Sequence, residues 1–278
     1  MFPPRKILFP VDFSDRCTDA ARMVETFAGH FQSELTILHV VEPLTYNDLP
    51  VDAGEMDEEQ LQTYLVKELK HFDVRRLLLR GDPAKQIIEL ASSEHFDLIM
   101  MPTHGYGQFR RFIIGSVAAK VLHDADCPVW TGVHMENVPR LEDISFRKIV
   151  CAVDLKEQSC RALRWAARFA SEFGANLKVV HAIPSAKETA DLYGYEEAMQ
   201  GLKAAAIRRL EGLVESIQVQ AEISVIAEEV PQAVRATVER VRGDLLVIGR
   251  SVENGVLGRL RTNAYSIIRQ SPCPVISV

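Results

Sequence analysis

The clearest pattern that could do chemistry lies in the loop between residues 102 and 117. Gly105 and Gly115 are separated by nine residues, and Ser116 follows at the start of SVAAKVLHDA, whose apolar residues have helical spacing. Glycine lets a backbone approach a ligand closely or adopt positive φ, and the first turn of a helix offers unpaired N–H groups and the positive end of its dipole. Together these features predict an anion site, most simply for a di- or triphosphate.

Other phosphate-binding motifs fit this loop less well. The chain has no GxxxxGK[ST] sequence, and Arg110 stands where a dinucleotide fingerprint would need its third glycine after Gly105 and Gly107. Another interpretation assigns no ligand at all, only a glycine-rich turn that joins a strand to a helix. The spacing alone does not decide between a phosphate cradle and such a turn.

The loop lies in the first of two similar halves of the sequence, which form an internal repeat. The segment RKILFPVD, which ends at Asp12, returns as RKIVCAVD, which ends at Asp154, and a CPV tripeptide recurs near the end of each copy. Two more anchors, ELTILHVVEP with NLKVVHAIPS and FDLIMMP with GDLLVIG, keep the same order. We therefore predict two domains, 1–138 and 139–278, joined in the polar stretch HMENVPRLEDISF.

The segments that must position the loop alternate between two kinds. KILFPV, LTILHVV, VRRLLLR, DLIMMP and CPVWTGV are short apolar runs typical of strands, whereas TDAARMVETFAGHF and PAKQIIELASSE have helical spacing, with Ser14 placed as a helix cap. Apolar strands that alternate with helices indicate a parallel sheet covered on both faces. Each half is predicted to be a doubly wound, Rossmann-like α/β domain of five parallel strands in the order 3-2-1-4-5, with ligands beyond the carboxyl ends of the strands.

The loop resembles the nucleotide-binding signature of the universal stress protein family, G-x2-G-x9-G-[ST]. Pro102 stands at the first glycine, Gly105 at the second and Gly115 at the third, and Ser116 supplies the hydroxyl. The aspartate after the first strand, the HVVEP strand, the GDP turn and the CPV before the last strand also look like this family. Because the resemblance extends over both halves, the chain is similar to a tandem universal stress protein.

This resemblance implies a stress-response or regulatory protein that binds an adenine nucleotide, normally ATP, with or without Mg²⁺. By matching position, Pro10, Val11 and Asp12 would line the adenine and ribose, Val41 would meet the adenine through its backbone, Met101, Pro102, His104 and Gly105 would line the ribose and first phosphates, and Gly115, Ser116 and Val117 would hold the terminal phosphates. The chemistry agrees, since a carboxylate at a strand end suits a hydroxyl or amine and backbone amides suit phosphate. We predict no catalytic residue and no metal site.

Two departures from the signature bear on binding. Pro102 has a fixed φ and no N–H, and the loss of one neutral hydrogen bond would weaken affinity by up to about tenfold. In the second half Gly249 keeps the first glycine, but Val252 replaces the second, and Arg261 stands at the helix entry. We therefore expect the second half to be silent for ATP, although it keeps Asp154, and Arg261 could instead reach another anion.

Other tempting residues have plainer interpretations. The sequence places no nucleophile or partner carboxylate beside His104, which is therefore expected to line the ligand. His39 and His181 end matching strands and are expected to pack or to bond a nearby loop. Arg110 and Arg111 either neutralise phosphate or face solvent.

Composition limits the class of protein. The chain of 278 residues is 47% hydrophobic and 25% charged, which is typical of a soluble globular protein, and its net charge of −6 argues against nucleic acid as the main partner. The amino terminus lacks the features of a signal peptide and no apolar run is long enough to cross a bilayer, so we expect a cytoplasmic protein without membrane contact. The five cysteines form no CxxC pair and predict neither a disulfide framework nor a zinc site.

These observations favour a binding module over an enzyme. Without a P-loop lysine or an evident base, at most slow ATP hydrolysis is expected, and the HxGH or SGGxDS motifs of related nucleotidyl-transfer and pyrophosphatase chemistry do not occur. The remaining alternative is a dimerisation scaffold that binds no nucleotide. From the family resemblance we also expect the two halves to pair through their last strands, CPVWTGV and CPVISV, and a homodimer of whole chains is compatible with this.

Overall fold

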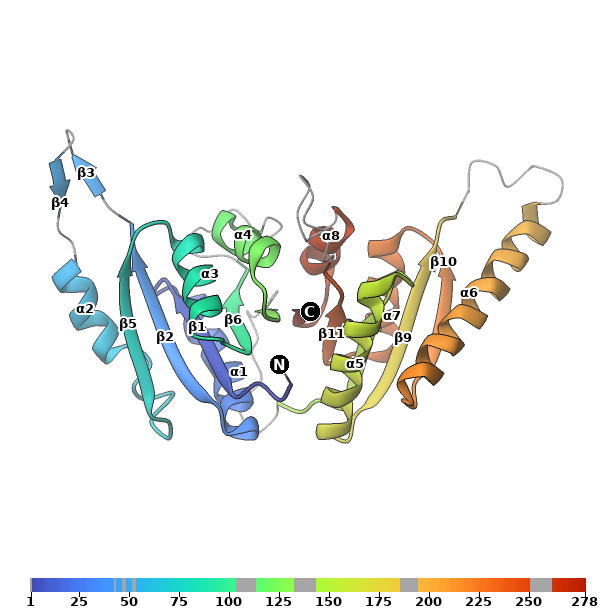
Figure 1. Cartoon of the computed structure of the whole chain (residues 1–278), viewed down its shortest axis with the longest axis horizontal. Coiled ribbons are helices and arrows are strands. Elements are labelled where there is room, and N and C mark those ends of the chain that lie inside the picture. The colour runs from blue at the N-terminus through green and yellow to red at the C-terminus, as the bar shows by residue number, and fades with distance from the viewer. Residues whose placement is uncertain are drawn as a thin grey trace. The chain divides into compact units, whose positions relative to one another are not determined.

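The chain forms two compact α/β units, Met1–Ile144 and Ser145–Val278 (Figure 1). The computed structural model describes residues 2–42, 44–46, 49–51, 54–103, 114–132, 144–185, 195–250 and 262–278, with backbone only for 44–46, 49–51, 54–57, 195 and 262. The predicted domain boundary between residues 138 and 139 lies outside the described residues.

The first unit is built on a five-stranded parallel sheet. Its strands are β1 (Lys6–Val11), β2 (Glu34–Val41), β5 (Val74–Arg80), β6 (Leu98–Pro102) and β7 (Val129–Gly132), in the spatial order β5-β2-β1-β6-β7. Its helices are α1 (Asp15–Phe31), α2 (Gly54–Thr63), α3 (Pro83–Ser93) and α4 (Ser116–Asp124), and the short strands β3 (Leu44–Tyr46) and β4 (Leu49–Val51) form an antiparallel pair after β2. Numbered along the chain, the sheet strands have the predicted order 3-2-1-4-5.

The second unit repeats this plan. Its strands are β8 (Lys148–Ala152), β9 (Asn176–Ile183), β10 (Glu222–Ala227), β11 (Leu245–Ile248) and β12 (Val275–Ser277), in the order β10-β9-β8-β11-β12, again with parallel pairing throughout. Its helices are α5 (Glu157–Glu172), α6 (Tyr195–Ile217), α7 (Val230–Val241) and α8 (Thr262–Gln270). The predicted doubly wound fold is thus confirmed in both halves.

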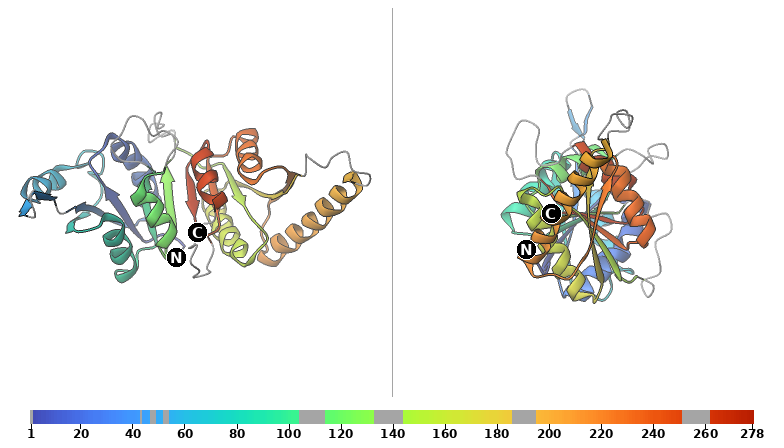
Figure 2. Two further views of the ribbon diagram at one scale, coloured as in Figure 1. Left: turned by 90° about the horizontal axis from the view of Figure 1, so that it is seen from above. Right: turned by 90° about the vertical axis from the view of Figure 1, so that its right-hand side faces the viewer.

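Helices cover both faces of each sheet (Figure 2). The strands are continuous apolar runs because their side chains are buried on both faces. In β1, consecutive residues point to opposite faces, yet Ile7, Leu8 and Phe9 are all fully buried. Among the described residues, no helix is long and apolar enough to cross a membrane.

The two copies also share a clamp where the first strand begins. Asp97 Oδ2 accepts hydrogen bonds from the backbone N–H groups of Arg5 at 3.0 Å and Lys6 at 3.1 Å. Asp244 Oδ2 accepts the matching bonds from the N–H groups of Arg147 and Lys148, at 2.7 and 2.8 Å. The aspartate of the FDL and GDL anchors therefore ties the fourth strand of each unit to the first.

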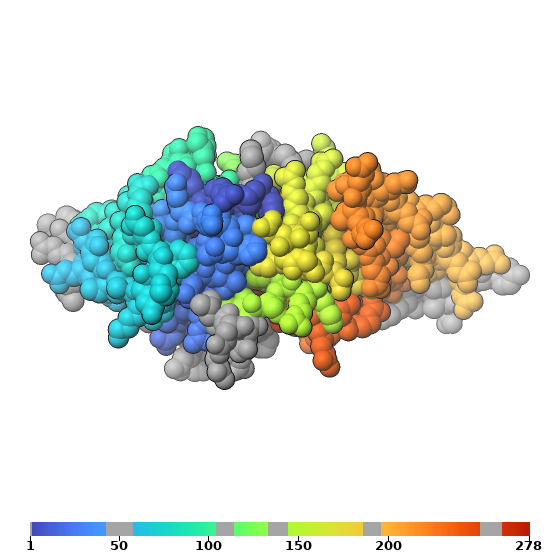
Figure 3. Space-filling model, turned by 90° about the horizontal axis from the view of Figure 1, so that it is seen from below, coloured from blue at the N-terminus to red at the C-terminus, as the bar shows by residue number. Residues whose placement is uncertain are grey.

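In the first unit, the amino ends of the sheet strands lie at the bottom of Figure 1, which is the side that Figure 3 shows, where atoms of the α1–β2 region (blue) and of the α2–β5 region (cyan) form part of the surface. The carboxyl ends of these strands lie on the opposite side of the same unit. Ligands of doubly wound sheets bind beyond the carboxyl ends, so the candidate site is expected away from the face in Figure 3.

Candidate nucleotide site

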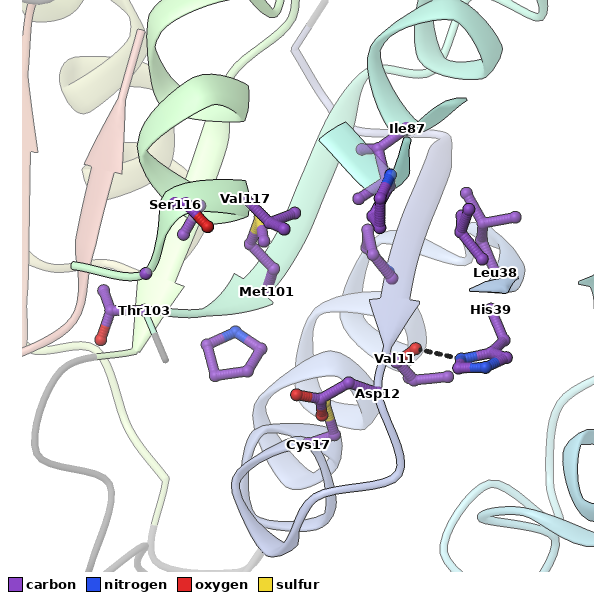
Figure 4. Close-up of a pocket in the computed structure, with 16 residues that line it drawn as sticks. Val11, Asp12, Cys17, Leu38, His39, Ile87, Met101, Thr103, Ser116 and Val117 are labelled. Carbon is purple, nitrogen blue, oxygen red and sulfur yellow. Dashed lines mark hydrogen bonds between the residues drawn. The ribbon is translucent and has the colours of Figure 1, made fainter. Parts of the chain in front are cut away.

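A cavity of about 250 Å³ opens at the carboxyl ends of β1, β2 and β6 and reaches the first residues of α3 and α4 (Figure 4). It brings together eight residues that the sequence assigns to a nucleotide: Pro10, Val11, Asp12, Met101, Pro102, Gly115, Ser116 and Val117. These come from three segments that are far apart in the chain. His104 and Gly105, as well as Arg110 and Arg111, lie outside the described residues.

Asp12 is held by the turn between β1 and α1. Its Oδ1 accepts hydrogen bonds from the Ser14 N–H at 3.1 Å, the Ser14 hydroxyl at 2.6 Å and the Cys17 thiol at 3.2 Å. Its Oδ2 has no hydrogen-bond partner within the described part of the chain. The carboxylate is therefore fixed through one oxygen, and the other is available to a ligand at the cavity wall.

Ser14 has a different role from the predicted one. It does stand at the N-cap position of α1, but its side chain makes no cap hydrogen bond, because the hydroxyl donates to Asp12 instead. In α3 the expected chemistry occurs, since the Asp82 side chain accepts the Lys85 N–H at 2.7 Å.

Cys17 is a neutral donor in this arrangement. Burial, with a smaller contribution from the negative charge of Asp12, raises the pKa of the Cys17 thiol far above its ordinary value. The thiol therefore keeps its proton at physiological pH and can donate it to the carboxylate.

The start of α4 forms another wall of the cavity. Gly115 is its N-cap, and the first intrahelical bond runs from Ala119 N–H to Gly115 O at 2.8 Å. The N–H groups of Ser116, Val117 and Ala118 precede that bond, and all three residues line the cavity. An anion at this end would meet both these donors and the positive end of the helix dipole.

Gly115 has φ −60° and ψ 151°, an extended conformation that any residue can adopt. The glycine is therefore not needed here for positive φ, which was one of two expectations for it. The second expectation for Gly115 stays a prediction: without a side chain, it leaves room for a ligand at the start of α4.

The turn after β1 is buttressed from β2 and from the segment after α2. His39 Nδ1 donates to Val11 O at 2.8 Å, and its ring lies 4.3 Å from that of Phe13, which has a positive φ of 62°. The Tyr64 hydroxyl donates to Ser14 O at 3.2 Å. The expectation of a local hydrogen bond for His39 is correct, and His181 Nδ1 donates to Val153 O at the same distance of 2.8 Å.

The cavity also contains residues that the sequence did not single out for it: Cys17, Leu38, His39, Val40, Pro83, Ile87, Thr103 and Ala118. The usable signal was strand register, since β1 and β2 pair Pro10 with Leu38 and Val11 with His39. Val41, in contrast, is absent from the lining, and its carbonyl oxygen accepts the Gly81 N–H at 3.0 Å. Among the described residues, no group of three or more His, Cys, Asp or Glu side chains could hold a metal ion.

Fold and site together define a doubly wound α/β protein with a candidate anion- and hydroxyl-binding cavity at the switch point of its first sheet. The sequence profile of the universal stress protein family matches residues 3–131 and again residues 145–278. The chain therefore belongs to the universal stress protein family, with two copies of its domain.

Individual relatives agree with this assignment. Universal stress protein MJ0531 of Methanocaldococcus jannaschii is 33% identical over an alignment of 135 residues, and the match covers 45% of this chain and 79% of that protein. The crystal structure of a universal stress protein from Archaeoglobus fulgidus DSM 4304 has a TM-score of 0.77 at 22% identity and covers 99% of this chain and 98% of its own, which shows the shared fold. Another Archaeoglobus fulgidus universal stress protein was solved in complex with dAMP; it is 26% identical, covers 48% of this chain and 98% of its own, and has a TM-score of 0.36.

Proposed function

We propose that the first unit of this protein binds an adenine nucleotide, most simply ATP, and that the second unit does not. The observation that carries the proposal is a single cavity in which one side can accept a hydrogen bond from a hydroxyl and another side can donate hydrogen bonds to a phosphate. At one side lies the carboxylate of Asp12, whose Oδ2 has no hydrogen-bond partner among the described residues, and at another lie the first N–H groups of α4. Membership of a nucleotide-binding family supports the same reading.

In this proposal the nucleotide is held by three kinds of contact. A ribose hydroxyl donates to Asp12 Oδ2, and the adenine packs against the apolar wall formed by Val11, Leu38 and Val40. The phosphates accept from the amides of Ser116 and Val117, with or without Mg²⁺.

The proposed role is regulatory and not catalytic. Among the described lining residues the histidine is His39, whose Nδ1 donates its proton to Val11 O and so helps to hold the turn after β1. We propose that occupancy by the nucleotide changes what the protein contacts in a stress response, with at most slow hydrolysis of ATP.

Release of nucleotide from the purified protein tests this proposal. Acid extraction and mass spectrometry are expected to find about one adenine nucleotide per chain in the parent, retention in Asp154→Ala, and loss in Asp12→Ala and in Gly115→Val. The variant Asp154→Ala is the matched control, because it removes the equivalent carboxylate from the second unit.

Three outcomes would contradict the proposal in different ways. A parent that carries no nucleotide and gives no heat with millimolar adenylates would favour the scaffold. Equal loss from Asp12→Ala and Asp154→Ala would contradict the assignment to the first unit. Steady turnover of ATP at about 1 per second or faster would favour an enzyme.

A further inference from the structure

The second unit contains a smaller counterpart of the cavity in the first. Its volume is about 150 Å³, and it lies at the carboxyl ends of β8, β9 and β11. Eight wall residues of this cavity stand at the same positions of the repeat as wall residues of the first cavity. They are Ala152, Val153, Asp154, Val180, Ala182, Val234, Ile248 and Gly249, which correspond in this order to Pro10, Val11, Asp12, Leu38, Val40, Ile87, Met101 and Pro102. The frame of the site is therefore kept in both copies.

The two aspartates differ in what remains of their hydrogen-bonding capacity. Asp154 Oδ1 accepts from the Lys156 N–H at 3.0 Å and the Ser159 hydroxyl at 2.9 Å, just as Asp12 Oδ1 accepts from Ser14 and Cys17. Asp154 Oδ2, however, accepts from Gln158 Nε2 at 2.7 Å. In the second unit, the oxygen that corresponds to Asp12 Oδ2 is therefore already hydrogen-bonded to a side chain of the same unit, that of Gln158.

Gln158 also takes up space in the cavity. It is one of the lining residues, whereas Arg16, at the same place in α1, is not a lining residue of the first cavity. A Cβ on Gly249 would lie 3.3 Å from Gln158 Cγ and 3.3 Å from Gln158 O. Gln158 therefore sits between the end of β8 and the residue after β11, which correspond to the two strand ends that border the first cavity.

We propose that Gln158 is the residue that closes the second site, and that its amide occupies the position of a ligand hydroxyl on Asp154. The site that it closes would take a ribonucleoside, whose hydroxyls can donate to Asp154 Oδ2 in place of the amide. This inference rests on the proposed function, because the role of Asp154 is taken from that of Asp12. The proposed contacts come from described residues alone, and none is assigned to residues 251–261, which lie outside the described part of the chain.

Removal of the amide should open the site. In the variant Gln158→Ala, a nucleoside no longer competes with a short, charge-assisted hydrogen bond, so its affinity for the second unit should rise by on the order of tenfold or more. The variant Glu157→Ala is the matched control, since it truncates the preceding residue of the same helical turn, which does not line the cavity.

The experiment is equilibrium dialysis of the full chain against labelled adenosine, with the number of molecules bound per chain as the readout. We expect about one for the parent and for Glu157→Ala, and two for Gln158→Ala. Adding Asp154→Ala to Gln158→Ala should return the number to one, which assigns the extra adenosine to the second unit.

The two proposals fail differently in this experiment. One adenosine in the parent and still one in Gln158→Ala would overturn the role of Gln158 and leave the proposed function intact. Two in the parent would also overturn that role, because the second site would then be open. No adenosine or ATP bound by the parent would overturn the proposed function itself. Native-state hydrogen exchange of the β8 and β9 amides, unchanged from the parent, reports that the second unit of each variant is folded.

Discussion

At the scale of single residues, the two carboxylate oxygens of Asp12 have different surroundings. Ser14 and Cys17 donate hydrogen bonds to Oδ1, whereas Oδ2 has no partner among the described residues. Asp154 is the same residue in the same place, but Gln158 adds a donor to its second oxygen. Two identical residues therefore have different chemical capacity, and one neighbour at the start of the following helix makes the difference.

Pro102 offers a prediction at this scale. It ends β6 and lines the cavity, and it lacks the N–H that a glycine at this point of the family signature would have. We expect both Pro102→Gly and Pro102→Ala to tighten ATP binding by about two- to tenfold, because each restores one donor. Isothermal titration calorimetry of the full chain measures this change.

Comparison of the two substitutions identifies the cause. Improvement in Pro102→Gly alone would mean that backbone freedom, and not the donor, limits binding. Unchanged affinity in both would contradict the prediction. Pro231→Ala, in α7 of the second unit, controls for the loss of a proline elsewhere.

At the scale of elements, the site depends on how strand ends and helix starts are brought together. Asp97 and Asp244 tie the fourth strand of each unit to the beginning of the first, by paired hydrogen bonds from consecutive backbone N–H groups. In the first unit these are the strands β6 and β1, whose other ends carry Pro102 and Asp12. The clamp therefore helps to fix the relation between the two strand ends that border the cavity.

Removal of the clamp should loosen one unit at a time. Asp97→Ala is expected to cost about 1–3 kcal/mol in the stability of the first unit, because two backbone donors lose a carboxylate acceptor. In native-state hydrogen exchange, amides of β1 and β2 should exchange faster while those of β8 and β9 stay unchanged. Asp244→Ala should give the reverse pattern. If either variant accelerated amide exchange equally in both units, the assignment of each aspartate to the stability of its own unit would be wrong.

At the scale of the whole molecule, the chain is a duplicated universal stress protein domain in which the two copies have diverged at the site more than in the fold. Each copy keeps the parallel sheet and the strand-end aspartate. The cavity of the second is smaller, and Gln158 lies in it. This divergence supports the proposal that only the first unit binds nucleotide.

Pairing of the two halves through their last strands stays a prediction at this scale. If β7 and β12 pair within one chain, the amides of Val129–Gly132 and Val275–Ser277 should be protected from hydrogen exchange in a chain that sediments as a monomer. Protection that appears only at concentrations where the protein dimerises would indicate pairing between chains. Unprotected amides in both strands at every concentration would contradict both arrangements.

The sequence by itself determined the duplication, the α/β class, the strand order and the family, because these follow from periodic apolar runs and from motifs that are local in the chain. It also identified half of the described cavity wall, since Asp12, Met101 and Gly115 lie in recognisable segments. The tertiary structure alone decided which oxygen of Asp12 is available, that Cys17 and Ile87 line the cavity, and that Gln158 engages Asp154. These facts depend on side-chain positions set by packing between distant segments, which no local pattern encodes.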